Sequence, residues 1–432
     1  MRRVCVDRRE GGGRVATDDL QLQSRVRLVH IGPHKTGTTA VQGAFQRARE
    51  RLAAEGVFYP GKGRQPLWSI LAVTRQPALV GDPLPEIAYW HNLIRSIDAA
   101  GDKSVVVSSE FFADADDAAA RRVVRDLGPR VHVAVTLRPL AKILPSQWQQ
   151  YMQNGYCMPY LDWLEGILSD PPRTPTPGFW RRHRHDKLIA RWAAAAGPEN
   201  LTVIVVDESD RLMLLRTFTA MLGLPNGVLV PDQGVANRSL TLAEAEVVRR
   251  LNEEFRRSEW PGSSYSRFMR YGAVEKLKSR QPGPDETPIT TPVWALKRAA
   301  GIGAEVAQNI ASLGVRVVGD LATLSAGSSP GDASSRAAGL SQTGNACEDA
   351  ELLLPAEAAA AAIIGAFQAG GVAGLKPAEV LREVDAKSMT RVLAQRGRLR
   401  MRRTLRLRGT RKQETGRQGT PRQGAGNQGA RK

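Results

Sequence analysis

The chain has 432 residues, enough for one large domain or two of ordinary size, and carries a formal net charge of +18. Its three cysteines are odd in number and far apart in the sequence, which argues against a disulfide framework and against a Cys-x-x-Cys metal site. No run approaches the ~20 apolar residues of a membrane span, and the N-terminus lacks the apolar core of a signal peptide, so we expect a cytoplasmic protein.

The first ordered stretch is predicted at residues 25–48, RVRLVHIGPHKTGTTAVQGAFQRA, after a disordered leader over residues 1–24. It begins with a mostly apolar run that is typical of a strand in a parallel sheet. Gly32 and Pro33 end this run, and apolar residues at helical spacing follow Gly37. The sequence therefore predicts a strand, a short loop and a helix.

A loop that leads from a strand into a helix can bind an anion, because the first-turn amides lack partners and the helix dipole favours negative charge. In this loop Lys35 adds a full positive charge, and Gly37 allows the backbone to approach a ligand closely. Three further residues supply hydroxyl donors: Thr36, Thr38 and Thr39. We predict a phosphate-binding loop rather than an ordinary turn with a solvated lysine.

The order of residues in this loop differs from a Walker A motif, in which the lysine follows the second glycine. Here Lys35 precedes Gly37, and two threonines come next. The order Lys-Thr-Gly-Thr-Thr resembles the 5′-phosphosulfate loop of sulfotransferases that use 3′-phosphoadenosine 5′-phosphosulfate (PAPS), and GPHKTGTTA is most similar to the heparan sulfate N-sulfotransferase type. The resemblance implies that Lys35 contacts the phosphosulfate and its bridging oxygen, and that the neighbouring loop residues cradle the same group.

A second buried strand is predicted at residues 104–108, and Glu110 follows at its carboxyl end, where open α/β sheets bind ligands. The string Ser-Ser-Glu is similar to many bacterial sulfotransferases, and its position matches that of the family's catalytic base. The resemblance implies that Glu110 takes the proton from the acceptor. The structural alternative is an acid that complements a helix dipole.

A third buried strand is predicted at residues 131–137, followed at once by Arg138 and a helix that carries Ser146. This arrangement resembles the family's 3′-phosphate signature, which implies that Arg138 and Ser146 bind the 3′-phosphate of PAPS. An arginine at a strand end offers a forked donor that matches a phosphate. A fourth strand is predicted at residues 201–206, and Arg238 either reaches the cofactor phosphate or lies on the surface.

Two stretches carry weaker predictions. Residues 61–85 are rich in proline and glycine and are expected to form a loop, in which Trp68 either lines the acceptor site or packs the loop onto the core. Residues 181–187, RRHRHDK, are expected to form a solvated loop or helix edge, because no acid or cysteine cluster accompanies the histidines as a metal site would require.

The C-terminal part shifts in composition. A sulfotransferase domain is predicted over residues 25–324, followed by a flexible Ser/Gly-rich linker over 325–351 and a small helical appendage over 352–395. Residues 396–432 are predicted to be a disordered polybasic tail, able to bind an anionic partner non-specifically. Of the net charge of +18, +13 falls between residues 391 and 432, so the bulk of the protein is only mildly basic.

Together these patterns predict an α/β fold, with a P-loop-like parallel sheet flanked by helices and a disordered basic tail. The resemblance implies a bacterial, PAPS-dependent sulfotransferase that needs no metal and acts on a hydroxyl or amine of a carbohydrate, glycolipid or small metabolite. The alternatives are a P-loop kinase that uses ATP, and a non-catalytic protein that binds 3′-phosphoadenosine 5′-phosphate (PAP) or another anion.

Overall fold

The computed structural model describes residues 20–78, 82–173, 175–231, 238–259, 262–326 and 355–370. These residues belong to two compact units, one formed by residues up to 242 and from 283 to 352, the other by residues 243–282 and from 353 onward. No helix among the described residues is long and apolar enough to span a membrane. The predicted tail over 396–432 lies outside the described residues, as do residues 1–19 of the leader and 327–351 of the linker.

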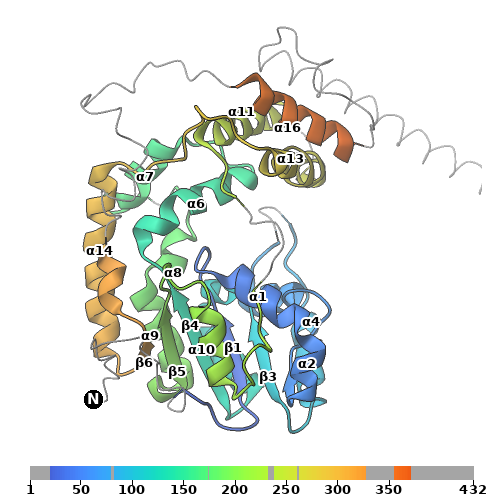
Figure 1. Cartoon of the computed structure of the whole chain (residues 1–432), viewed down its shortest axis with the longest axis vertical. Coiled ribbons are helices and arrows are strands. Elements are labelled where there is room, and N and C mark those ends of the chain that lie inside the picture. The colour runs from blue at the N-terminus through green and yellow to red at the C-terminus, as the bar shows by residue number, and fades with distance from the viewer. Residues whose placement is uncertain are drawn as a thin grey trace, which may run out of the picture. The chain divides into compact units, whose positions relative to one another are not determined.

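The first unit is built on a six-stranded, all-parallel sheet with helices on both faces (Figure 1). The strands lie in the order β2-β3-β1-β4-β5-β6, so β1 is flanked by β3 on one side and β4 on the other. Their bounds are β1 Arg27–Ile31, β2 Val57–Phe58, β3 Ser104–Ser108, β4 Val131–Leu137, β5 Leu201–Val205 and β6 Arg316–Val318. The predicted α/β class with a parallel, helix-flanked sheet is confirmed.

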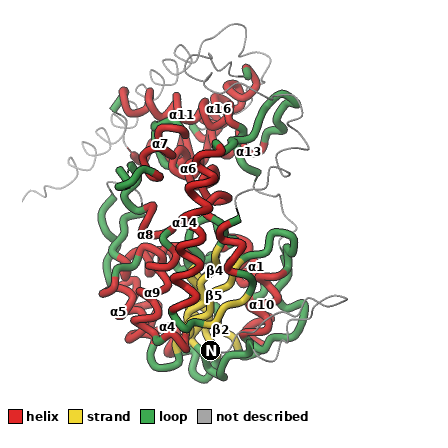
Figure 2. Tube along the Cα trace, turned by 90° about the vertical axis from the view of Figure 1, so that its left-hand side faces the viewer, coloured by secondary structure: helices red, strands yellow, loops and turns green. Residues whose placement is uncertain are grey.

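The helices of the first unit connect the strands, as parallel pairing requires. They are α1 Thr38–Arg47, α2 Arg49–Ala54, α3 Leu67–Thr74, α4 Ala88–Asp98, η2 Glu110–Asp114, α5 Asp117–Leu127, α6 Leu140–Gln153, α7 Tyr160–Leu168, α8 Phe179–His183, α9 His185–Ala196, η3 Pro198–Asn200, α10 Met213–Met221, α14 Val293–Ser312 and η5 Leu321–Ser325. Figure 2 shows the strands enclosed between these helices.

Alternate residues of each strand enter different cores, because successive side chains of a strand point to opposite faces. Leu28 of β1 and Val106 of β3 pack with α1, α2 and α10. Val29 of β1 and Val107 of β3 pack on the other face, with α3, α4, α5, α9 and α14. Both faces are therefore buried, which explains why the strands appear in the sequence as nearly continuous apolar runs.

Two of the sequence predictions are wrong in this unit. Residues 61–85 contain a helix, α3 Leu67–Thr74, whose apolar residues pack into the core. Trp68 on this helix is 51% exposed, so it does not anchor a loop in the core. Residues 181–187 are not a solvated edge, because His183 and His185 are only 1% and 3% exposed.

The second unit is entirely helical in its described part, with α11 Leu242–Arg257, α12 Gly262–Tyr265, the π-helix η4 Ser266–Val274, α13 Glu275–Ser279 and α16 Ala356–Ala369. The helix α16 falls within the predicted appendage and packs on η4 and α13. A Cβ on Gly365 would lie 2.3 Å from the carbonyl oxygen of Gly272, so the two helix backbones meet through a pair of glycines.

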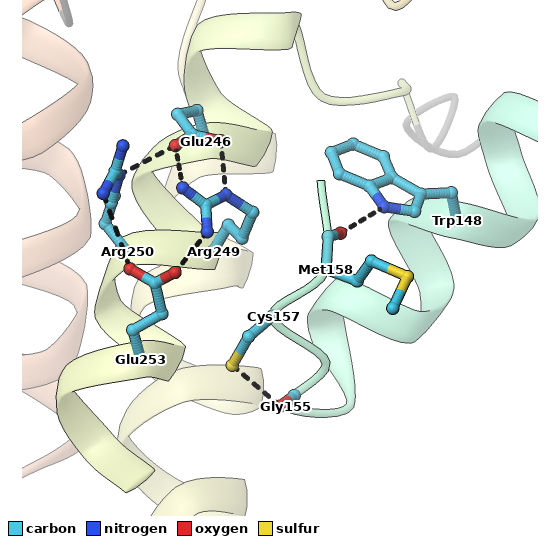
Figure 3. A network of polar contacts seen from close by, with 8 residues as sticks. All are labelled: Trp148, Gly155, Cys157, Met158, Glu246, Arg249, Arg250 and Glu253. Atoms are coloured by element: carbon cyan, nitrogen blue, oxygen red, sulfur yellow. Dashed lines mark hydrogen bonds and ion pairs between the residues drawn. The ribbon is translucent and has the colours of Figure 1, made fainter. Parts of the chain in front are cut away.

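Helix α11 carries a short ladder of ion pairs (Figure 3). Arg249 is paired with Glu246 and with Glu253, and Arg250 is paired with the same two glutamates, at the spacings of three and four residues that place side chains together on a helix. Figure 3 also shows the Trp148 indole of α6 in the first unit donating to the Met158 carbonyl at 3.0 Å, which fixes the chain after α6.

Candidate functional site

The predicted phosphate-binding loop joins β1 to α1 through residues 32–37. Lys35 and Gly37 have φ angles of 72° and 93°, so both adopt the left-handed conformation. The Thr38 hydroxyl donates to the Gly32 carbonyl at 3.0 Å, and a Cβ on Gly32 would lie 1.9 Å from that hydroxyl oxygen. Only glycine fits at position 32, because the loop closes tightly onto the start of α1.

The three threonines of this loop differ in what their hydroxyls do. Thr36 is fully buried and donates to the Pro33 carbonyl at 2.7 Å, and the buried Thr38 closes the loop as described above. Thr39 is exposed. Among the described residues, none accepts a hydrogen bond from the amides of Gly37, Thr38 or Thr39. The backbone amides and Thr39 are therefore the donors that the loop presents outward.

A buried chain of polar side chains fixes the loop to the sheet. His30 of β1 shares a hydrogen bond of 2.8 Å with Ser108 of β3 and one of 3.3 Å with Thr136 of β4. Thr136 in turn lies 3.0 Å from the Thr36 hydroxyl. Burial lowers the pKa of His30 to about 3, so its ring is neutral and links three strand ends to the loop.

The members of this buried hydrogen-bonded network are not recognisable as partners in the sequence. The only local signal is a histidine inside an apolar strand, and its partners become visible only once the parallel register pairs His30 with Ser108 and with Ala134, two residues before Thr136.

Lys35 and Arg138 meet at the same loop. The Lys35 ammonium donates to the Gln150 side-chain oxygen of α6 at 3.2 Å. The Arg138 guanidinium, at the carboxyl end of β4, makes a long hydrogen bond of 3.5 Å to the Lys35 carbonyl. Two of the predicted cationic residues are thus brought together, although 103 residues separate them in the sequence.

Arg138 also has an acidic partner, which follows the neighbouring strand. Its Nε lies 2.5 Å from the Glu208 carboxylate, which follows β5. Lys142 of α6 is 4.0 Å from the same carboxylate. An anion at Arg138 would have to share the guanidinium with Glu208 or displace it, so Glu208 is a competitor at this position.

Ser146 and Arg238 each donate a hydrogen bond to a backbone carbonyl of their own segment. The Ser146 hydroxyl donates to the Ile143 carbonyl of its own helix at 3.0 Å, and between the described residues no hydrogen bond joins it to Arg138. Arg238 donates to the carbonyl of its neighbour Ser239 at 3.0 Å.

Glu110 begins η2, directly after β3, and two amides hold its carboxylate. Gln42 of α1 donates to Oε2 at 3.0 Å, and Gln65 donates to Oε1 at 3.2 Å. The Gln65 side chain is itself fixed by Ser109, whose hydroxyl donates to it at 2.6 Å. The carboxylate is therefore oriented from two sides by donors that sequence analysis missed, because both lie far from Glu110 in the chain.

Glu110 and Lys35 lie at the same edge of the sheet. His34 and Phe111, their immediate neighbours, pack ring edge to ring face with centroids 5.4 Å apart. The carboxyl ends of β1, β3 and β4 thus present the loop, the carboxylate and the guanidinium side by side, since β1 lies between the other two strands. Within the described residues, no group of three or more His, Cys, Asp or Glu residues is placed to hold a metal ion.

Comparisons with known proteins give one structural likeness. No family model matches the chain, and no curated protein matches it. The chain is similar to the crystal structure of a sulfotransferase from Alicyclobacillus acidocaldarius, with 16% sequence identity, 68% of this chain and 97% of that chain covered, and a TM-score of 0.40. At this identity and TM-score, the likeness by itself assigns neither a ligand nor a reaction to this chain.

Proposed function

We propose that the chain transfers a sulfuryl group from PAPS to a hydroxyl or amine of an acceptor. The observation that carries the proposal is the meeting of Lys35 and Arg138 at one glycine-bearing loop, beside a carboxylate on the neighbouring strand end. The order of residues in that loop, Lys-Thr-Gly-Thr-Thr, supports a phosphosulfate ligand over the nucleotide triphosphate of a Walker A loop.

The site offers suitable partners to each end of the donor. Lys35 and the outward amides of Gly37, Thr38 and Thr39 suit the 5′-phosphosulfate, because α1 directs the positive end of its dipole there. Thr36 holds the loop from within.

Arg138 suits the 3′-phosphate when the Glu208 carboxylate releases the guanidinium or shares it with the phosphate. Ser146, about two helical turns into α6, supplies a hydroxyl to the same phosphate if it releases its own helix carbonyl.

When bound, PAPS supplies an activated sulfuryl group and a phosphate leaving group. Lys35 neutralises charge on that phosphate as the bond between sulfur and the bridging oxygen breaks. Glu110 accepts the proton of the acceptor hydroxyl or amine as the new bond to sulfur forms, so that neither a proton nor an electron pair is left unassigned. Gln42 and Gln65 hold the carboxylate in one orientation for this transfer.

Calorimetric titration tests the donor. We expect PAP to bind tightly, ATP with Mg²⁺ to bind weakly, and Lys35→Ala to lose PAP binding. Arg47→Ala is a suitable control, because Arg47 lies at the other end of α1 and the variant keeps every residue of the loop. Preference for ATP with Mg²⁺ would favour a kinase, whereas tight PAP binding without turnover of PAPS would favour a non-catalytic binding protein.

A further inference from the structure

The helices α4 and α5 lie side by side on one face of the sheet (Figure 2), and a surface groove opens between them. The groove has a volume of about 420 Å³, which is in the range of small-molecule sites. Most of the residues that line it are charged: His91, Ile94, Arg95, Arg122, Arg125 and Asp126. None of them belongs to the candidate functional site described above, so the groove is a separate feature of the first unit.

The make-up of the groove follows from helix geometry. Residues at spacings of three and four share one face of a helix. The lining residues repeat this spacing on both helices, at positions 91, 94 and 95 of α4 and at positions 122, 125 and 126 of α5. One basic stripe from each helix therefore borders the same space.

Two sets of contacts hold the walls of the groove in place. The Trp90 indole of α4 donates to the Asp126 carboxylate of α5 at 2.9 Å. In the first strand, β1, Arg27 is paired with Asp98 of α4 at 3.0 Å and donates to the Leu127 carbonyl of α5 at 2.8 Å. The groove is thus formed without a ligand, as small-molecule sites usually are.

The contacts of Arg27 also place the groove along the strands. They bring the last turns of α4 and α5 to the start of β1, whereas the loop with Lys35 follows the end of β1. The groove therefore lies toward the amino ends of the strands, away from the edge that carries the phosphate-binding loop. An inference about the groove goes beyond sulfuryl transfer and does not depend on it.

The charges that border the groove do not balance. Arg125 is neutralised by Asp126, because its Nε and Nη2 donate to Oδ1 at 3.0 and 2.7 Å. Arg95 donates to the uncharged side chain of Asn92. Among the residues that the structure describes, no acid forms an ion pair with Arg95 or Arg122. Two positive charges thus remain at the groove, one on each wall.

These charges favour a small dianion. The guanidinium fork matches a phosphate bidentately, and a phosphate monoester carries nearly two negative charges at pH 7, where a carboxylate carries one. The half-buried Ile94 offers an apolar contact to the carbon part of such an ester. Two short helical stripes are much smaller than the roughly 20–30 residues that each partner contributes to a stable protein interface, which favours a small molecule.

We propose that the groove between α4 and α5 binds a small phosphate monoester. Arg95 and Arg122 hold the phosphate from opposite walls, and Ile94 contacts the carbon skeleton of the ligand. Asp126 keeps Arg125 and Trp90 in position and so sets the width of the groove.

Calorimetric titration of the full chain with phenyl phosphate tests this site. All titrations use protein that carries Lys35→Ala, to weaken binding at the phosphate-binding loop, and about 0.15 M salt, to screen long-range attraction. We expect a further Arg122→Ala substitution to weaken binding about tenfold. Arg121→Ala is the matched control, because Arg121 is the exposed neighbour of Arg122 and does not line the groove, and it should change the affinity less than about twofold.

The same titrations distinguish other sources of binding. Equal affinities in the Arg121→Ala and Arg122→Ala proteins would place the phosphate at the loop or on the general positive charge of the chain and would overturn the proposal, as would the absence of binding. Benzoate carries the same ring with one negative charge, and we expect it to bind at least about tenfold more weakly than phenyl phosphate. Equal affinity for benzoate would show that the groove does not select a phosphate.

Discussion

Arg138 is held by two different partners, a backbone carbonyl of the phosphate-binding loop and the carboxylate of Glu208. The carbonyl contact positions the guanidinium at the loop, and the carboxylate neutralises it when no anion is bound. Because both Arg138 and Glu208 are partly exposed, water screens their attraction, and a phosphate can compete with Glu208 for the same forked donor.

The first prediction concerns this competition. Arg138→Ala should weaken PAP binding by about tenfold to a hundredfold, since a charge-assisted bidentate contact contributes roughly 1.5–3 kcal/mol. Binding of adenosine 5′-phosphate, which lacks the 3′-phosphate, should change by less than about threefold. Glu208→Gln should tighten PAP binding. Calorimetry measures the dissociation constants of PAP and of adenosine 5′-phosphate for each variant, and the ratio of these two constants is compared with that of the wild type.

Arg216→Ala provides the control for this experiment, because Arg216 of α10 is an exposed arginine that, like Arg138, is paired with an acid, in this case Asp210. A ratio that stays the same in Arg138→Ala would mean that Arg138 does not recognise the 3′-phosphate.

The second prediction concerns Glu110. Glu110→Gln keeps the size of the side chain but cannot accept a proton, so turnover of PAPS with an acceptor should fall by about 10²–10⁴-fold while PAP affinity changes little. Turnover is measured as the rate at which PAP is formed from PAPS, and PAP affinity is measured as its dissociation constant. Glu165→Gln, at an exposed position of α7, should behave as the wild type. Retained turnover in Glu110→Gln would contradict the assignment of Glu110 as the base.

At the scale of elements, the junction of β1 and α1 depends on close approach of the backbone to Thr38. The Thr38 hydroxyl leaves no room for a side chain at position 32. The same hydroxyl holds the loop closed through its hydrogen bond to the Gly32 carbonyl. The shape of the loop is thus fixed by contacts within six residues, while its attachment to the sheet depends on the buried chain through His30.

The third prediction tests this junction. Gly32→Ala should lower the free energy of unfolding by about 1–3 kcal/mol, because the added methyl overlaps the Thr38 hydroxyl and forces the loop apart. PAP affinity should fall with it. Gly301→Ala in α14 is the matched control: no atom lies within 4 Å of its new methyl, and alanine favours a helix, so stability should stay equal or rise. Urea denaturation checks both, and equal stability of Gly32→Ala and wild type would disprove the predicted overlap.

At the scale of the whole molecule, several histidines are buried in the neutral form. Burial lowers the pKa of His30 to about 3 and those of His132 and His185 to about 4. An unfolded histidine titrates near 6.5, so between about pH 6.5 and pH 4 the unfolded state binds more protons than the folded state. Stability is therefore complete above pH 6.5 and is lost as the pH falls.

The fourth prediction follows from this loss of stability at low pH. The free energy of unfolding should decrease below about pH 6.5 by up to about 1.4 kcal/mol per pH unit for each such histidine, before most carboxylates titrate. His132→Asn should reduce the slope between pH 6.5 and 5. His91→Asn, at an exposed position, should leave the slope unchanged. A pH-independent stability across this range, measured by urea denaturation, would contradict the neutral burial of these rings.

The sequence by itself determined the parallel sheet. Residues 104–108 and 131–137 were predicted with the bounds that β3 and β4 have, because strands buried on both faces are continuous apolar runs. The helix α3 was missed since its apolar residues lie between proline- and glycine-rich flanks, so composition over residues 61–85 outweighed a short helical segment.

Only the tertiary structure decided which polar residues are buried and what they contact. Residues 181–187 are basic and appear solvated in sequence, yet the Arg182 side chain is only 19% exposed and pairs with the buried Asp114, 68 residues away. The amides on Glu110 and the carboxylate on Arg138 likewise come from distant segments. Apolar periodicity is a property of neighbouring residues and can be recognised locally, whereas a hydrogen bond or ion pair between distant residues exists only after the chain has folded.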